Sequence, residues 1–455
     1  MAVYNENNLI SMTRSALEHM IFPIVTRQEI ADEGPTIFAR GERCRLWTED
    51  GREFLDMLGS PTRANSLGYA NHEIAQAVYD QLLKVHFVGT GANTTAPAIQ
   101  LAEKLSTLLP GDLSRIFFVS TGSEAVEGAL KLAKQYHQAK GKKPRAYKVI
   151  SRWNAYHGAT MGCLSVTDWL PVRDIQDPRL TGHSFVPSPT RYRNPFRVDD
   201  ETWADMCATY LERQIELEGP DTVAAFIGEP IMQANGVQVP VKGYWKRVRE
   251  ICSKHDILLI CDEIITGFGR TGSWFACNHF EIVPDILTMA KAMSAGYVPA
   301  GAVATRPEIA DAIPMYRNVH TYSGHAGAMA ACLKAIEIKE RDGLIDRARE
   351  NGEYFLNQLK SMVGNSPIVG EVRGMGHWHA IDFTSDKGSR EPFKDDTVKS
   401  VRRAMREKGV LATAIGYAIE MSPPLIATRQ DLDIAVEVAA KAIDEVARAR
   451  SPSSS

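Results

Sequence analysis

The stretch "CDEIITGFGRTGSWFA", residues 261–276, begins with two carboxylates at the end of an apolar run. That run, "ILLIC" at 257–261, is typical of a β-strand that is buried on both faces. Asp262 and Glu263 therefore lose water at the edge of a buried strand, and such a carboxylate requires a cation or hydrogen-bond donors. We expect a partner of this kind beside Asp262, and its identity bears directly on what the protein does.

Three further apolar runs resemble 257–261, and each leads into a polar segment that contains glycine. They are "RIFFVS" at 115–120 before "TGSEAVEGALKLAKQY", "AYKVIS" at 146–151 before "RWNAYHGAT", and "VAAFIG" at 223–228 before "EPIMQANG". Such runs, alternating with helical stretches, predict an α/β fold with a mostly parallel central sheet flanked by helices. Because ligands of these sheets bind at the carboxyl ends of the strands, we expect the four polar segments to form one site.

The two ends of the chain differ from its middle. Residues 1–65 contain short strands with turn signals, and helical periodicity returns from about residue 331, interrupted by "VRGMGHWHAIDF" and "YAIEMSPPL". We predict a large domain at 66–330 and a small α+β domain assembled from residues 1–65 and 331–455.

Composition argues against several classes of protein. The 455 residues carry a net charge of −3 and show no basic cluster with interleaved aromatic residues, so nucleic-acid binding is not indicated. No uninterrupted apolar stretch is long enough to cross a bilayer, and the first twenty residues lack the pattern of a signal peptide. The seven cysteines form no CxxC pair, so we expect reduced thiols, no zinc site and a cytoplasmic protein.

The segment after the strand at 115–120 predicts an anion-binding site. Gly122 and Ser123 open a helix whose apolar residues recur at helical spacing. The free backbone N–H groups and the positive dipole end at the start of such a helix bind phosphate. A simple hydroxyl N-cap without a ligand explains the same residues, and no nucleotide-binding glycine motif is present.

A lysine in apolar surroundings gives the second chemical feature. Lys291 lies in "ILTMAKAMSAGYVPAG", residues 286–301, where desolvation favours a neutral, nucleophilic amine, although an ordinary surface lysine is the alternative. A phosphate cradle, an amine and a buried acid together match pyridoxal 5'-phosphate, which needs a phosphate site, a lysine for its aldehyde and an acid facing its ring nitrogen. The protonated ring nitrogen is then the cation that we expect Asp262 to face.

The sequence resembles the class III (ω-) aminotransferases, a family of pyridoxal-phosphate enzymes with the fold type I architecture. The resemblance runs from about residue 30 to 445 and rests on "VSTGSEAVEGALKLAKQY", "AYHGAT", "IGEPI", "ICDEIITGFGRTG", "PDILTMAKAMSAGYVPAGAV", "TYSGHAGAMAA" and "MSPPL". One such segment is weak support, whereas seven in order are highly specific. The resemblance implies a transaminase that moves an amino group from a primary amine or ω-amino compound to a keto acid such as pyruvate, through pyridoxamine phosphate.

The resemblance also implies roles for individual residues. Lys291 holds the cofactor's aldehyde in a Schiff base and afterwards moves the proton at the substrate carbon. Asp262 pairs with the ring nitrogen, while Ile264 and Tyr156 lie against opposite faces of the ring.

The remaining implied roles concern the phosphate and the assembly. Gly122 and Ser123 take the phosphate, and Thr321 of "TYSGH" matches a residue that reaches it from the neighbouring subunit. A homodimer, or a tetramer that contains it, would then complete the site. His157 and Arg270 are open to acid–base or anion-binding roles, but packing in turns explains them equally well.

The sequence departs from the family at its substrate end. Many members carry a carboxylate-binding arginine ten residues before the "PP" pair, and here that position is Thr413. Glu229 of "GEP" matches a glutamate that pairs with this arginine in some members, so it lacks that partner. Arg63 stands where amine-type members often have a bulky aromatic, and we hypothesise that it lines the substrate pocket and contacts an acid group or Glu229. A solvent-facing loop arginine is the alternative.

Two other functions share these motifs or part of them. Aminomutases, racemases and decarboxylases of the same fold retain the lysine and the aspartate, so they are one alternative. A non-catalytic protein that binds pyridoxal phosphate is the other. The substrates implied are small molecules, an amine donor and a keto-acid acceptor, and the departure at Thr413 favours a primary amine over an ordinary α-amino acid.

Overall fold

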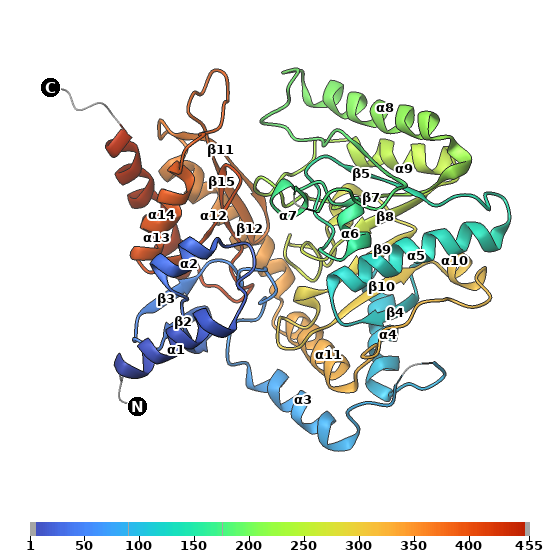
Figure 1. Cartoon of the computed structure of the whole chain (residues 1–455), viewed down its shortest axis with the longest axis horizontal. Coiled ribbons are helices and arrows are strands. Elements are labelled where there is room, and N and C mark those ends of the chain that lie inside the picture. The colour runs from blue at the N-terminus through green and yellow to red at the C-terminus, as the bar shows by residue number, and fades with distance from the viewer. Residues whose placement is uncertain (1–5, 90, 175, 451–455) are drawn as a thin grey trace.

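The computed structural model describes residues 6–89, 91–174 and 176–450 (Figure 1). Its centre is a seven-stranded sheet in which β10 runs antiparallel to both neighbours and the other paired strands are parallel. In spatial order the strands are β4 (Arg115–Val119), β10 (Gly301–Thr305), β9 (Ile286–Met289), β8 (Leu258–Asp262), β7 (Val223–Gly228), β5 (Lys148–Arg152) and β6 (His183–Val186). The predicted α/β fold with a mostly parallel sheet is confirmed.

All four apolar runs of the sequence are strands of this sheet. The run at 223–228 is β7 without a shift, and the run at 257–261 differs from β8 by one residue. β4 and β9 are both antiparallel to β10, so β4 points in the same direction as β5, β7 and β8. The carboxyl ends of the four strands, and the polar segments after them, therefore share one edge of the sheet.

Helices cover both faces of the sheet (Figure 1). One face carries α5 (Gly122–Lys140) and α6 (Met161–Val166), and the other carries α4 (Ala96–Leu108), α8 (Asp200–Glu218), α9 (Tyr244–Lys254) and α11 (Ala326–Arg341).

The strand β8 is buried along its whole length, as predicted. Leu258 and Ile260 belong to the apolar cluster beneath α5, whereas Leu259 and Cys261 belong to the cluster beneath α8 and α9. Because side chains alternate along a strand, Asp262 continues the face that α5 covers. The Asp262 carboxylate therefore lies on the same side of the sheet as the start of α5.

Two smaller sheets are built from the beginning and the end of the chain, which lie on the left of Figure 1, and the first of them combines strands from both ends. The first consists of β1 (Phe38–Glu42), β2 (Arg45–Thr48), β3 (Glu53–Asp56) and β13 (Val410–Leu411). The second consists of β11 (Val369–Met375), β12 (Trp378–Phe383), β15 (Ala418–Met421) and β14 (Thr413–Ile415), and α12 (Leu344–Val363), α13 (Thr397–Glu407) and α14 (Arg429–Arg450) pack nearby. The pairing of β3 with β13 links the two ends, while the predicted boundary at residue 331 falls inside α11, so the domain division stays a prediction.

The remaining helices are short or lie near the surface. They are α1 (Glu6–His19), α2 (Arg27–Glu33), α3 (His72–Lys84), α7 (Leu170–Arg173), α10 (Pro307–Asp311), and the 3₁₀ turns η1 (Pro220–Thr222), η2 (Ala276–Phe280) and η3 (Lys291–Met293). Within the described part of the chain, no helix combines the length and the apolar character needed to cross a membrane.

Candidate active site

The start of α5 forms a cradle of backbone N–H groups that have no acceptor within the helix. The Thr121 hydroxyl caps the helix by accepting a hydrogen bond from the Glu124 N–H at 3.2 Å. In a helix the first N–H groups have no intrahelical acceptor, which leaves those of Gly122 and Ser123 available to an anion. A Cβ on Gly122 would lie 3.0 Å from the Ile264 side chain, so only glycine lets the cradle lie against this residue. The hydroxyl N-cap is therefore present, and it leaves the N–H groups of Gly122 and Ser123 available for an anion.

Asp262 is buried and held by three donors at the end of β8. The Nδ1 atom of His157 lies 2.7 Å from Asp262 Oδ2. The Ile264 N–H and the Thr288 hydroxyl donate to Asp262 Oδ1 at 3.1 and 3.2 Å. Together these contacts fix the plane of the carboxylate. His157, which the sequence left undecided between function and packing, is thus the closest ionisable partner of Asp262.

His157 and Tyr156 come from the loop after β5. The His157 side chain is buried, and its Nε2 atom has no hydrogen-bond partner within the described residues. The Tyr156 ring is half-buried and meets the Trp169 ring edge-on, with 5.7 Å between the ring centroids. Burial raises the pKa of the Tyr156 hydroxyl, so this side chain stays neutral.

Lys291 begins the turn η3, directly after β9. Its neighbour on β9, Thr288, lies opposite Asp262 in the strand register. Lys291 has a φ of +48°, a left-handed conformation that is strained for a residue with a side chain. The residue keeps some accessible surface, yet it lies deep in the protein, and burial lowers the pKa of its amine to about 7. The charge of Arg63 contributes to this lowering, and the carboxylates of Asp262 and Glu420 act in the opposite direction.

Glu229 follows β7 and pairs with Arg152 rather than with Arg63. Arg152 Nη2 donates to the backbone carbonyl of Glu229 at 2.6 Å and lies 3.3 Å from its Oε2 atom. The Tyr156 N–H donates to Glu229 Oε1 at 3.4 Å. Burial raises the pKa of the Glu229 carboxyl, and the nearby charges of His157 and Arg152 act in the opposite direction.

Arg63 is buried and forms a two-pronged ion pair with Glu420 on β15. Its Nε and Nη2 atoms donate to the two carboxylate oxygens at 2.6 and 2.7 Å, and Nη1 donates to the Pro61 carbonyl at 3.1 Å. With its amide oxygen turned toward the guanidinium, Gln233 accepts from Nη1 and Nη2 at 3.2 and 3.0 Å. These acceptors engage all five N–H groups of Arg63.

Glu420 was not identified from the sequence, although a signal was available. It lies in the apolar stretch "YAIEM", where a fully buried acid requires a partner just as Asp262 does. The Trp378 indole also donates to Glu420 Oε1 at 2.6 Å. Thr413, at the position of the family's arginine, lies opposite Glu420 in the pairing of β14 with β15. A carboxylate, that of Glu420, therefore lies beside Thr413, and the guanidinium that pairs with it belongs to Arg63, near the beginning of the chain.

Arg270 is fully buried and bonds to backbone carbonyls through Nη1, while its Nε and Nη2 atoms have no hydrogen-bond partner within the described residues. Its Nη1 atom donates to the carbonyls of His377 and Pro423 at 3.0 and 2.5 Å, which ties the loop after β8 to the "SPP" segment. Burial lowers the pKa of the guanidinium to about 10. These contacts agree with the packing interpretation of Arg270.

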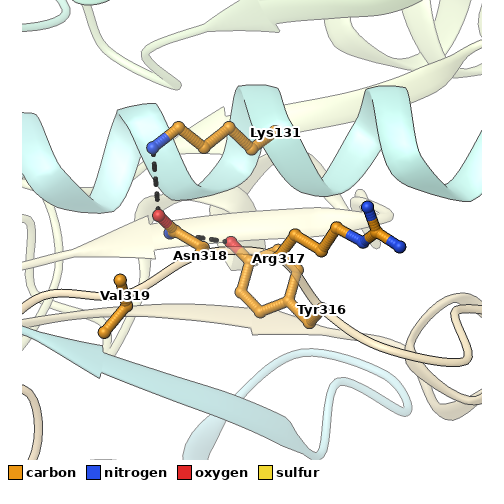
Figure 2. A pocket seen from close by; sticks show the side chains of 5 residues that line it. All are labelled: Lys131, Tyr316, Arg317, Asn318 and Val319. Atoms are coloured by element: carbon orange, nitrogen blue, oxygen red, sulfur yellow. Dashed lines mark hydrogen bonds between the residues drawn. The ribbon is translucent and has the colours of Figure 1, made fainter.

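Thr321 is exposed on the loop that precedes α11. Part of this loop runs along α5, as Figure 2 shows, and lines a hollow of about 460 Å³ with Lys131. Lys131 donates to the Asn318 amide oxygen at 3.0 Å, and the Tyr316 hydroxyl donates to the Gly128 carbonyl at 2.8 Å. The loop is therefore fixed to the helix that begins at the cradle, while Thr321 faces outward.

Comparison with known proteins agrees with this arrangement. Residues 28–443 match the family Aminotransferase class-III. An uncharacterized aminotransferase of Bacillus subtilis, YhxA, is 38% identical over 414 residues, which are 88% of this chain and 90% of that protein. A putrescine–pyruvate aminotransferase of Pseudomonas aeruginosa is 32% identical over 437 residues, which are 95% of each chain. Among solved structures, the omega transaminase of Pseudomonas jessenii in complex with PMP shares 32% identity and a TM-score of 0.94, covering 97% of this chain and 99% of that one. The chain belongs to the class III aminotransferase family, as its sequence motifs implied.

Proposed function

We propose that this aminotransferase uses pyridoxal 5'-phosphate to move an amino group from a primary amine to a keto acid such as pyruvate. The observation that carries the proposal is the convergence of three groups at one edge of the sheet: the start of α5, the Asp262 carboxylate and the Lys291 amine. A relative named for putrescine and pyruvate, and a structural neighbour in complex with PMP, support the choice of reaction and cofactor.

The residues present fit this cofactor. We assign the phosphate to the N–H groups of Gly122 and Ser123, where a Cβ on Gly122 would fill the space. We assign the ring to the space between Ile264 and Tyr156, with its nitrogen toward Asp262. When bound, the cofactor withdraws electrons from the substrate carbon. An acid held by three donors suits this task, because its position is fixed before the reaction begins.

Lys291 is assigned the nucleophilic and proton-moving role. An amine with a pKa of about 7 is substantially neutral at neutral pH, and only the neutral amine can bond to a carbonyl or accept a proton. The left-handed turn at Lys291 sets the direction in which the side chain leaves the backbone. We therefore propose Lys291 and Asp262 as the catalytic residues.

Arg63 and Glu229 are proposed to line the substrate end of the site. While Glu420, Gln233 and Pro61 engage Arg63, its guanidinium has no free N–H for a substrate carboxylate. Thr413 supplies no second guanidinium. This arrangement offers no preformed guanidinium to a carboxylate on the amine donor, so it favours donors that lack one. To bind the carboxylate of the keto-acid acceptor, Arg63 would have to exchange its present partners, or another donor would have to take that role.

We further propose a homodimer in which the neighbouring subunit's copy of this loop completes the phosphate site. Thr321 is flanked by exposed apolar side chains, including Val319 and Tyr322, and such residues favour contact with another protein surface. The seven cysteines are all buried and unpaired, which suits the reducing environment of the cytoplasm that we propose as the location.

The test is a panel of primary amines offered to the purified protein with added pyridoxal 5'-phosphate, first with pyruvate and then with 2-oxoglutarate. We expect carbonyl product from at least one amine, and one equivalent per active site when the acceptor is omitted. Racemization or decarboxylation without this stoichiometric product would favour the other enzymes of the same fold. Lys291→Ala should abolish turnover, while Lys334→Ala, a change at the surface of α11, should retain it. Failure of the parent protein to bind the cofactor would contradict the proposal.

A further inference from the structure

A second lysine lies buried behind the turn that carries Lys291. Lys339, on α11, is fully buried, and its Nζ atom donates to the backbone carbonyl of Ala292 at 2.6 Å. The same Nζ atom lies 5.5 Å from the centroid of the Phe268 ring. Within the described residues, no carboxylate forms an ion pair with Lys339.

This environment is unfavourable for a lysine. Burying an amine with a single strong acceptor carries a large desolvation cost, which an apolar side chain of similar length would avoid. Burial lowers the pKa of Lys339 to about 7, but the neutral amine still has N–H groups and keeps the bond to Ala292. Stability of the core alone does not explain why a lysine occupies this position.

The acceptor of this bond lies in the turn of the catalytic lysine. Ala292 follows Lys291 in η3, and Lys291 has the strained φ of +48°. A left-handed conformation is unfavourable for a residue with a side chain, so it persists only where the surroundings enforce it. The Ala292 carbonyl also accepts the Ala295 N–H at 3.1 Å, so Lys339 holds a carbonyl that already closes the turn.

We propose that Lys339 is a positioning residue, which clamps the Ala292 carbonyl and so holds the turn that aims the Lys291 amine at the cofactor site. The inference rests on the role proposed for Lys291. The inference adds a role for α11, which would fix the position of the Lys291 turn through Lys339. The same helix follows the loop that carries Thr321. Lys339 itself points at the Ala292 carbonyl and takes no part in the chemistry.

The experiment compares Lys339→Met with two controls on the same helix. Met has similar length and lacks a donor, while Ile336→Val alters the buried face of α11 and Lys334→Met alters its surface. Hydrogen exchange of the amides at 290–295 is measured on the full-length protein, both without cofactor and after loading with pyridoxal 5'-phosphate. Lys339→Leu, which is also apolar and lacks a donor, serves as a second variant if Lys339→Met does not fold.

We expect faster exchange at 290–295 in the Lys339 variants alone, with a thermal midpoint that is unchanged or higher in Lys339→Met. The turnover number should fall on the order of tenfold with the KM for the amine nearly unchanged, because misplacement of a reacting group affects the chemical step more than binding. Unchanged exchange at 290–295, or equally faster exchange throughout the protein, would overturn the proposal. So would borohydride trapping of the cofactor on Lys339. Exchange in the cofactor-free protein tests the clamp even if the proposed reaction is wrong.

Discussion

Asp262 and Glu420 are both buried acids on apolar strands, and they differ in what surrounds their oxygens. Asp262 is held by a histidine, a hydroxyl and one N–H group, and it lies on the sheet face where α5 begins. Glu420 is held by both prongs of Arg63 and by the indole of Trp378. Asp262, at the proposed cofactor end, is oriented by its neighbours, and none of them is an arginine or a lysine. Glu420, at the proposed substrate end, forms an ion pair with Arg63.

The difference separates the charge that we propose as catalytic from one that we propose as structural. A carboxylate whose neighbours only orient it can interact strongly with an incoming cation. A carboxylate that already forms a two-pronged ion pair interacts only weakly with a further cation. Removing its partner leaves an uncompensated buried charge. The contrast therefore predicts that changes at Glu420 act first on folding and changes at Asp262 act first on the reaction.

The largest effect is expected from Glu420→Ala, which leaves the Arg63 guanidinium buried without its carboxylate. We expect a loss of about 3–5 kcal/mol in the free energy of unfolding, measured by chemical denaturation. The double variant Arg63→Met/Glu420→Met removes both charges and should recover most of this loss. Glu337→Ala, which breaks an exposed pair with Lys334, should change stability by less than about 0.5 kcal/mol. A double variant as unstable as Glu420→Ala would show that the pair does not behave as a unit.

The next effect is expected from Asp262→Asn, which keeps the shape of the side chain and removes its charge. We expect the turnover number to fall by about 10²–10³-fold, the range seen when one preorganised electrostatic group is removed from an active site. The free energy of unfolding should change far less than in Glu420→Ala. The turnover number is measured by steady-state kinetics with pyruvate and the amine of the panel that reacts fastest. Full activity in Asp262→Asn would remove the distinction between the two acids.

Much of the cofactor end could be predicted from the sequence, because its residues follow strands directly. A strand that is apolar at every position is buried on both faces, and the carboxyl ends of parallel strands share an edge. Asp262 and Gly122 are therefore expected at the same edge of the sheet. That they also lie on the same face follows from the alternation of side chains along β8 and from the packing of α5. Lys291 also follows a strand directly, so its local context was sufficient.

The substrate end could not be predicted in the same way, because its contacts join distant parts of the chain. Arg63 and Glu420 are 357 residues apart, and only the folding of the two ends into one unit brings them together. The partner of Glu229, Arg152, lies at the end of the neighbouring strand β5, and the sequence offered no reason to prefer it. The bond from Lys339 to Ala292 depends on how α11 packs beneath the sheet, which no local pattern specifies.

The smallest effect concerns the pKa of Lys291 in the cofactor-free protein. This pKa falls from 10.5 to about 7, chiefly through burial and also through the charge of Arg63, while the carboxylates of Asp262 and Glu420 act in the opposite direction. Removing the Asp262 charge should lower the pKa again, because an opposite charge near an ammonium favours its charged form. Arg63→Met/Glu420→Met removes one charge of each sign and should shift it less. The measurement is the pH dependence of labelling at Lys291 by a small amine-reactive reagent, followed by peptide mass spectrometry.

The same shift predicts how stability depends on pH. Below about pH 7 Lys291 is protonated in both the folded and the unfolded chain, and the cost of burying its charge is fully present. Between about pH 7 and 10.5 the unfolded chain binds more protons, so this group makes the folded state more stable as the pH rises. Lys339 has the same lowered pKa and contributes a slope of the same sign, so Lys291→Met should reduce the slope without abolishing it in denaturation experiments on the cofactor-free protein. A parent slope that Lys291→Met leaves unchanged would place the titrating group elsewhere, with Lys339 as the first residue to examine by the same substitution.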